Sequence, residues 1–464
     1  MFDVTIRSSC RSDGLVSSHR HNVVFLCNTY VEVDNFLPLI YFLRRNLPEL
    51  SQRICILKPD KSDLETSLLS TLLDSIELIT TSHLLSPKLR VIVKLLEAIT
   101  IRIKNVAETN KHNSTYSLHR FLVRTTLYLR KIFILLGRAD IRRIGQFDVV
   151  VAAPGIYDAI INPAKFGSVR RVETHLLRNI FEMPKLLKVM LPETYDQFLP
   201  GFSQTIVVDS NIMKKMDWVL LNSDKETESN PNYHTHVDVD KSLVIGCPRY
   251  SESWCLEIND LVCKDNQRMI EDTGVINVLY LPMRTTDTFP KYSSEENTRL
   301  ETIVIELVHR HKQIKLLVKP HPKVTTPFRF WSNVPESLHD RIEIFGSHTD
   351  TAQLMCRTDL IITPGTSVIA HYLWENKPVI LFGNWLREQG YRYVYEPWCF
   401  TEKDIPVVLN QLKSGITNVA ANPNTKSEMI DFFQLGLASE NYQEMLVSNF
   451  RKIFQSHHNS MSRI

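Results

Sequence analysis

Short apolar runs recur along the first half of the chain, and each one ends in loop residues. The runs cover residues 23–27, 53–57, 148–152, 218–221 and 243–245, and a helical pattern fills about 34–45. Apolar runs of this length without polar alternation are typical of strands buried on both faces, and their alternation with helices indicates a parallel sheet. The first half therefore predicts an α/β lobe.

The second half repeats this organisation, with runs at 275–281, 314–318, 342–345, 360–362 and 379–382. Residues 250–273 are rich in Ser, Glu, Asp and Asn, and we expect them to form an interdomain connection. The sequence thus predicts an α/β protein of two doubly wound, Rossmann-like lobes facing a central cleft. We expect a polar tail over 1–20, a first lobe over 21–249 and a second lobe over 274–425. In such sheets ligands bind beyond the carboxyl ends of the strands.

Composition narrows the class of protein. Hydrophobic residues make up 43% and charged residues 23%, a globular mix, and the formal net charge of +3 indicates no nucleic-acid partner. The eight cysteines form no Cys-x-x-Cys pair, and Cys27, Cys55 and Cys356 lie in apolar runs typical of buried thiols. We interpret this as a reducing compartment. Residues 1–20 lack the apolar core of a signal peptide, and no run of 18 apolar residues occurs, so we expect a soluble intracellular protein.

One segment departs from the neutral charge balance. Residues 88–143 contain thirteen Lys or Arg against three acids, Glu97, Glu108 and Asp140, interleaved with apolar residues at helical spacing. A basic amphipathic helical pair is typical of a surface that binds an anionic membrane. The alternative is a pair of packed helices whose outer face happens to be basic.

Two strand-end loops of the second lobe carry the most distinctive chemistry. The run 314–318 leads directly into Lys319-Pro320-His321-Pro322-Lys323, where two prolines fix the direction of one imidazole beside two cations. The run 360–362 breaks at Pro364-Gly365 and then offers the hydroxyls of Thr366 and Ser367, before a helix expected over about 367–375. A stiff turn and an ordinary helix cap are the alternatives for each loop, but the two loops together favour binding of nucleotide phosphates.

A third strand-end loop belongs to the same lobe. Arg284 and three threonines follow the run 275–281, where they can meet phosphate or sugar hydroxyls. A solvated loop is the alternative interpretation.

These motifs, in this order, resemble the bacterial capsular-polysaccharide glycosyltransferases. The shared features are Leu-Pro…Thr-Asp-Thr, Val-Lys-Pro-His-Pro and Ile-Thr-Pro-Gly-Thr-Ser…Lys-Pro-Val-Ile-Leu-Phe-Gly over 275–383, preceded by Gly246-Cys247-Pro248-Arg249. The group includes the capsule Kdo transferases and is distantly similar to the CMP-dependent sialyl- and polysialyltransferases and to the glycerophosphotransferases of wall polymers. The resemblance implies a GT-B fold, inverting sugar transfer and no essential metal or other cofactor. It also implies that His321 contacts the donor phosphate, that Thr366 and Ser367 bind it from the other side, and that helices over 426–464 pack back on the first lobe.

One position departs from the related transferases. Many of them carry Glu, in a Glu-Ala-Leu context, where this chain has His371-Tyr372-Leu373, and that glutamate commonly holds the donor ribose. We therefore count His371 among the donor-binding candidates with Lys319, Arg284 and Gly365. The departure leaves open which nucleotide binds and whether activity is weakened.

The catalytic base is expected from the first lobe, across the cleft from the donor. Inverting transfer needs a group that deprotonates the acceptor hydroxyl. Asp158 follows a Pro-Gly break after the run 148–152 and ranks first. Glu32 and Asp34 follow the first run, where Asp34 could equally be a helix N-cap, and Glu193 and Asp196 are outside candidates.

The sequence as a whole predicts an inverting, metal-independent GT-B glycosyltransferase of capsular or surface polysaccharide synthesis. Its donor would be a nucleotide sugar, with CMP slightly ahead of UDP or CDP, and its acceptor a glycan or a lipid-linked glycan. The expected location is the cytoplasm, with residues 88–143 holding the enzyme on the inner face of the membrane. The alternatives are a CDP-polyol phosphotransferase of wall polymers and a non-catalytic GT-B subunit of a capsule assembly complex.

Overall fold

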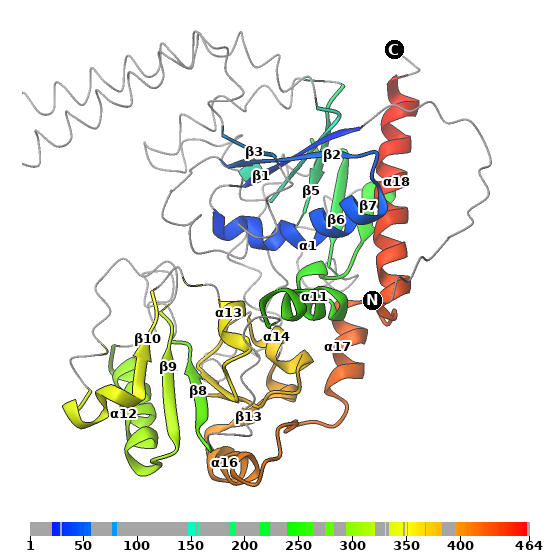
Figure 1. Ribbon diagram of the computed structural model, residues 1–464. Helices are drawn as coiled ribbons and strands as arrows, with labels where there is room; N and C mark the ends of the chain where they lie inside the picture. Colours follow the sequence, from blue (N-terminus) through cyan, green and yellow to red (C-terminus); the bar gives the residue numbers. More distant parts are fainter. Residues whose placement is uncertain are drawn as a thin grey trace, which may run out of the picture.

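The computed structural model contains two parallel sheets, one above the other in Figure 1, with helices packed around them. It describes residues 21–27, 30–56, 77–80, 147–153, 156–157, 183, 185–191, 214–222, 239–263, 274–282, 294–320, 330, 334–346, 349, 351–366, 368–382 and 395–461. Its two Rossmann-like lobes confirm the predicted α/β fold class.

The first lobe contains a sheet of order β3-β2-β1-β4-β5-β6-β7, in which every neighbouring pair is parallel. Phe25 of β1 pairs with Ile54 of β2 on one side and with Val151 of β4 on the other, so the middle of the sheet is apolar and buried. The elements are β1 (Asn22–Cys27), α1 (Tyr30–Asn46), β2 (Ser51–Ile56), β3 (Glu77–Thr80), β4 (Val149–Ala152), β5 (Leu187–Met190), β6 (Trp218–Leu221), the short helix η5 (Val239–Lys241) and β7 (Ser242–Val244).

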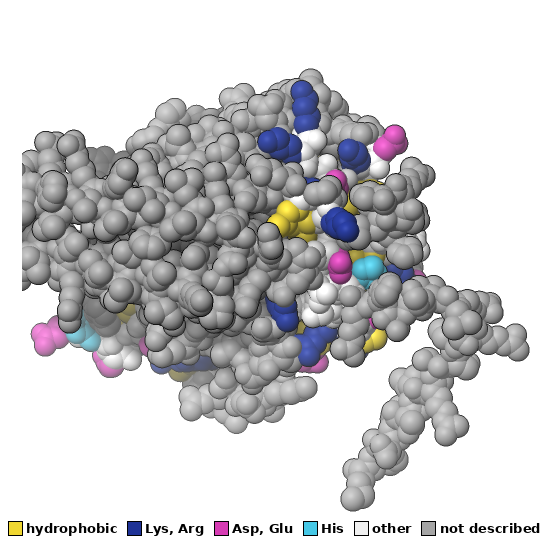
Figure 2. Space-filling model, turned by 90° about the horizontal axis from the view of Figure 1, so that it is seen from above, with side chains coloured by type: hydrophobic (Ala, Val, Ile, Leu, Met, Phe, Trp, Pro, Cys, Tyr) yellow, Lys and Arg dark blue, Asp and Glu magenta, His cyan; other side chains and the backbone are white. Residues whose placement is uncertain are grey.

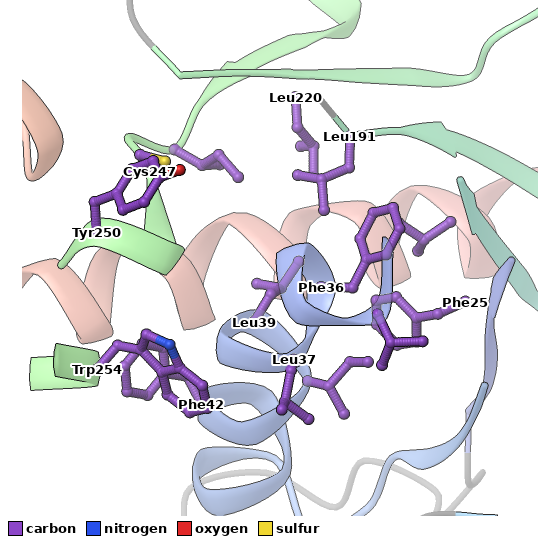
Figure 3. Close-up of a cluster of buried hydrophobic side chains, with 14 of the residues drawn as sticks. Phe25, Phe36, Leu37, Leu39, Phe42, Leu191, Leu220, Cys247, Tyr250 and Trp254 are labelled. Atoms are coloured by element: carbon purple, nitrogen blue, oxygen red, sulfur yellow. The ribbon is translucent and has the colours of Figure 1, made fainter. Parts of the chain in front are cut away.

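Helix α1 is the apolar link between the first sheet and the rest of the molecule. Phe36 and Leu39 lie on the side of Phe25 and Leu220, whereas Phe42 lies beside Trp254 (Figure 3). All of these side chains are buried, and full burial of a side chain of this size contributes about 1.5–3 kcal/mol. The helix is therefore held on two sides.

The second lobe contains a sheet of order β10-β9-β8-β11-β12-β13, again all parallel. Its own core includes Ile276, Val304, Leu316 and Ile380. The elements are β8 (Ile276–Tyr280), α12 (Ser294–Arg310), β9 (Ile314–Val318), η9 (Glu336–Arg341), β10 (Ile342–Ile344), α13 (Thr351–Met355), β11 (Leu360–Thr363), α14 (Ile369–Trp374), β12 (Val379–Leu381), η10 (Glu396–Trp398), β13 (Phe400–Thr401), η11 (Glu402–Asp404) and α16 (Ile405–Lys413).

The stretch expected to be an interdomain connection contains a helix. After η6 (Pro248–Tyr250), α11 (Glu252–Cys263) lies between the lobes in Figure 1. One face of α11 is buried through Trp254, Cys255 and Ile258, which lie at helical spacing. The stripe is narrow, and the many polar residues around it hide the helical pattern in the sequence. A continuous cluster of buried residues runs through this junction from the first lobe into the second.

The C-terminal helices divide between the lobes. Helix α18 (Ser439–Met461) runs along the first lobe in Figure 1, where Ser456 accepts a hydrogen bond of 3.0 Å from the Trp218 indole. Helix α17 (Thr425–Phe433) packs beside the second lobe instead, with Phe432 and Phe433 against Trp398. Helix α17 also reaches the end of the first lobe, where the Phe433 carbonyl oxygen accepts a hydrogen bond of 2.8 Å from the Cys247 N–H.

The cysteine interpretation holds for two of its three residues. Cys27 and Cys55 are buried free thiols, and burial raises the pKa of Cys55 to about 12. Cys356, however, is disulfide-bonded. The apolar run before Cys356 ends at Met355, the end of α13, so Cys356 lies beyond the buried helix.

Charged side chains of both signs share the face of the first lobe that Figure 2 shows from above. The basic segment 88–143 lies outside the described residues, so its predicted membrane role stays a prediction. Within the part of the chain that the structure describes, no helix is long and apolar enough to span a bilayer.

Candidate functional site

Three adjacent strands of the second sheet end beside one another. Strand β8 lies between β9 and β11, and the backbone N–H of Lys319, just past β9, donates to the carbonyl oxygen of Tyr280 at 3.1 Å. On the other side, the N–H of Leu281 donates to the carbonyl of Ile362 at 3.0 Å. Neighbouring strands are about 4.8 Å apart, so the three loops start within roughly 10 Å of each other. The fold thus gathers the loops that carry the predicted donor residues.

Thr363 ties two of these loops together. Its hydroxyl donates to the carbonyl oxygen of Leu281 at 2.9 Å and accepts from the N–H of Gly365 at 3.1 Å. Gly365 has φ 148°, a conformation that side chains with a Cβ rarely adopt, so the turn requires glycine here. Thr366 follows, half-buried, and α14 begins at Ile369, two residues later than expected.

Lys319 is placed differently from the solvent-facing cation that its loop suggests. Its side chain is 5% exposed, so most of it is packed inside the lobe at the end of β9. A long stem that covers apolar surface is common for lysine. His321 and Arg284, which follow the same strand ends, lie outside the described residues, as does Ser367.

His371 occupies the middle of α14 with 5% of its side chain exposed. Its ring packs edge-on against Tyr250, with centroids 6.2 Å apart at 74°. Burial, helped by the charge of Arg249, lowers the pKa of His371 to about 3, so the imidazole is neutral at physiological pH. Its Nδ1 atom is buried without a hydrogen-bond partner. Any donor contact by His371 would therefore be that of a neutral group, unlike the glutamate of the related transferases.

For Glu32 and Asp34, two candidates for the catalytic base, the structure describes the course of the backbone. Glu32 and Asp34 lie in α1, which begins at Tyr30, and not in a loop after the first strand. Asp34 is therefore no N-cap, and that interpretation is wrong. The helix begins earlier than expected because the apolar pattern that predicts it starts at Val33, and residues 30–32 show no helical pattern of their own.

Asp158 lies outside the described residues, but the residue before it does not. Tyr157 is fully buried, and its hydroxyl lies 3.2 Å from the carbonyl oxygen of Val150 and 3.1 Å from that of Val189. Burial, with a smaller contribution from Asp217, raises the pKa of Tyr157. The buried Tyr157 side chain thus fixes the chain one residue before Asp158. In the sequence, only the presence of an aromatic residue after the Pro-Gly break could have suggested this contact.

No group of three or more His, Cys, Asp or Glu side chains that could hold a metal occurs among the described residues. The polar groups that the structure does bring together are backbone amides, hydroxyls and Lys319 at one sheet edge, with His371 and Tyr250 at the junction.

Residues 200–400 match the sequence model of the CDP-glycerol:poly(glycerophosphate) glycerophosphotransferase family. The match covers less than half of the chain. None of the curated proteins compared matches the sequence. The matched segment contains all three strand ends. It confirms the expectation of a transferase enzyme of surface-polymer synthesis, without singling out the capsule Kdo transferases.

The solved structures that resemble the chain share its fold at low identity. The S. aureus protein MnaA, solved with UDP, is 11% identical with a TM-score of 0.50, over 94% of this chain and 97% of that one. A UDP-N-acetylglucosamine 2-epimerase is 12% identical with a TM-score of 0.50, over 93% and 97%. The wall teichoic acid polymerase TagF is 13% identical with a TM-score of 0.49, over 94% and 90%. The first two show that the two-lobed GT-B-like fold extends over nearly the whole chain.

Proposed function

We propose that this protein transfers a sugar or a polyol phosphate from a cytidine nucleotide donor to a growing surface polymer. The observation that carries the proposal is the family match over 200–400, because that segment contains the strand-end loops of the second lobe. The family acts on CDP-glycerol, and the motifs of residues 275–383 resemble transferases that use CMP-sugars. Cytidine is common to both.

The two donor chemistries share a leaving group. With a CMP-sugar, the acceptor oxygen bonds to the anomeric carbon, the bond from that carbon to the phosphate oxygen breaks, and CMP departs. With a CDP-polyol, the acceptor oxygen bonds to the outer phosphorus, the P–O–P bridge breaks, and CMP departs again. One site that stabilises departing CMP serves either reaction.

The predicted roles divide between the lobes. His321, Arg284 and the Thr366–Ser367 loop would bind the phosphates, with Gly365 shaping the turn and Lys319 adding positive charge from below. Asp158, or else Glu32 or Asp34, would accept the proton of the attacking hydroxyl. His371 would lie beside the nucleoside as a neutral group.

The family match favours the polyol-phosphate chemistry, and the motif order favours the sugar chemistry. Parallel assays of CMP release from a CDP-linked polyol and from CMP-linked sugars decide between them. Release from neither donor, with a folded protein and a suitable polymer acceptor, would contradict the proposal and favour a non-catalytic subunit.

The acceptor and the location belong to the same proposal. A lipid-linked glycan or polymer at the inner face of the cytoplasmic membrane would bring the acceptor to the enzyme, and residues 88–143 would supply the contact. Each basic residue near an anionic bilayer contributes about 1 kcal/mol. Replacement of Arg120, Arg124, Arg130 and Lys131 by Gln should therefore abolish cosedimentation with anionic vesicles at low salt. Equal binding of the wild type to neutral vesicles would contradict the electrostatic contact.

A further inference from the structure

Arg249 stands where the first lobe meets the second. It is the middle residue of η6, which follows β7 at the carboxyl edge of the first sheet. Pro248 begins this turn, and its ring fixes the backbone φ there. The Arg249 side chain is half-buried, with its guanidinium carbon 5.7 Å from the centre of the Tyr250 ring. The guanidinium is therefore held against an aromatic side chain.

Tyr250 is itself fastened to the second lobe. Its carbonyl oxygen accepts a hydrogen bond of 2.8 Å from the indole of Trp374 in α14. Its ring contacts the imidazole of His371, also in α14. Helix α14 is the element that directly follows the Gly365–Thr366 turn. A cation of the first lobe is thus fixed beside the helix that leads out of the candidate donor loop.

The charge that acts on the pKa of His371 is the positive charge of Arg249. Burial lowers the pKa of His371, and the positive charge of Arg249 lowers it further, so the imidazole is neutral. The carboxylates of Glu252 and Glu375 act together with Arg249 on the pKa of Cys255, so they lie around the same junction, and Glu375 directly follows α14.

We propose that Arg249 binds a phosphate oxygen of the nucleotide donor, from the first lobe and opposite the strand-end loops of the second. The inference rests on the proposed function and adds a residue to its site. Guanidinium is the group best suited to this task, because its planar fork matches two phosphate oxygens and stays charged at every physiological pH. An arginine from the first lobe would also make phosphate binding depend on how the two lobes are arranged.

The experiment distinguishes two roles for Arg249: binding of a donor phosphate, and structural support of the junction between the lobes. The affinities of CDP, CMP and cytidine are measured by calorimetry for the wild type, Arg249→Gln, Arg249→Lys and the control Arg357→Gln. Arg357 is a matched control, because its guanidinium carbon also lies over an aromatic ring, that of Phe345 at 5.4 Å, and it donates to Glu343 of the second lobe. Loss of one charge-assisted contact should weaken CDP and CMP binding by about 10- to 150-fold in Arg249→Gln.

Cytidine, which has no phosphate, should bind Arg249→Gln as it binds the wild type, and Arg249→Lys should recover part of the CDP affinity. An equal loss for cytidine and CDP would overturn the inference and make Arg249 a support of the junction. Unchanged CDP affinity in Arg249→Gln would overturn it as well. If wild-type protein binds neither CDP nor CMP, the proposed function fails first, and the role of Arg249 falls with it.

Discussion

The side-chain oxygen of Gln434 accepts a hydrogen bond of 2.6 Å from the backbone N–H of Glu252, and this joins the two places where the chain passes between the lobes. Gln434 is fully buried, and its amide nitrogen donates to the carbonyl oxygen of Leu437 at 2.8 Å. Ser439 donates in turn to the carboxylate of Glu252 at 2.9 Å. The outgoing and returning segments are thus one hydrogen-bonded unit.

Gln434→Leu should lower the free energy of unfolding by about 2–4 kcal/mol, because it leaves the Glu252 N–H and the Leu437 carbonyl without their partner. Urea unfolding followed by tryptophan fluorescence measures the change. Gln434→Glu keeps the acceptor but puts a buried carboxylate against the Leu437 carbonyl oxygen, so it should cost at least as much as Gln434→Leu at neutral pH. A loss below about 0.5 kcal/mol, the size of an ordinary surface substitution, would contradict a structural role for this amide.

Gly246→Ala should be among the most damaging substitutions at the junction. A Cβ at Gly246 would lie 2.4 Å from the carbonyl oxygen of Phe433, and the residue has φ +67°. That oxygen is backbone and already accepts a hydrogen bond of 2.8 Å from Cys247, so it cannot move aside. We expect a loss of about 3 kcal/mol or more, from overpacking and left-handed strain together.

Gly274→Ala is the matched control for that substitution. Gly274 has φ +61°, but a Cβ added there would have no other atom within 4 Å. Only the conformational cost of about 1–2 kcal/mol applies there. Similar melting temperatures for the two variants would show that the close approach at Gly246 is relieved without cost.

His371 should make the protein less stable in acid. The folded-state pKa is about 3, below the ordinary value of 6.5, so the unfolded chain binds the proton more readily. The contribution to stability is complete above pH 6.5 and falls by about 1.4 kcal/mol for each pH unit below it, toward pH 3. His371→Phe, which keeps an aromatic ring against Tyr250, should flatten the stability profile over the acid side of that window. An unchanged dependence of stability on pH in His371→Phe would mean that the imidazole reaches solvent. His309 is exposed, so His309→Gln is the control substitution.

Substitutions on the two sides of the cleft should separate donor binding from proton transfer. Asp158→Asn should abolish CMP release while CDP affinity stays near that of the wild type, because the carboxylate acts on the acceptor. His321→Ala should instead weaken donor use by about 10- to 150-fold in a folded protein. Steady-state CMP release and calorimetric CDP titration measure both. Unchanged turnover in Asp158→Asn would move the base to Glu32 or Asp34, and normal donor use in His321→Ala would exclude its phosphate contact.

Apolar runs identified most of the strands, and the exceptions have a physical cause. Strand β5 was missed because Lys188 interrupts its apolar run. That lysine is tolerated in a buried strand since its ammonium lies 3.2 Å from the carboxylate of Asp217, which also accepts from the Lys188 backbone N–H. Such a pair spans 29 positions and leaves no local pattern.

The candidate site was predictable at the level of loops and not of contacts. Parallel topology alone brings the ends of β8, β9 and β11 together, so the motifs after these strands were sufficient. The junction was not predictable, because the contacts of Tyr250 with Trp374 and His371 join positions more than 120 residues apart in two separate lobes. Only the assembled fold shows that His371 is buried and neutral.

The return of α18 to the first lobe has a consequence for the order of synthesis. The hydroxyl of Tyr442 donates to the carbonyl of Ile245 at 2.8 Å, and Phe450 and Ile453 complete the core that β1 begins. A ribosome delivers the strands of the first lobe early, but it delivers their last covering helix only after the whole second lobe. The nascent first lobe must therefore carry exposed apolar surface throughout that interval, and it is the part of the molecule that most needs protection from aggregation before its translation is finished.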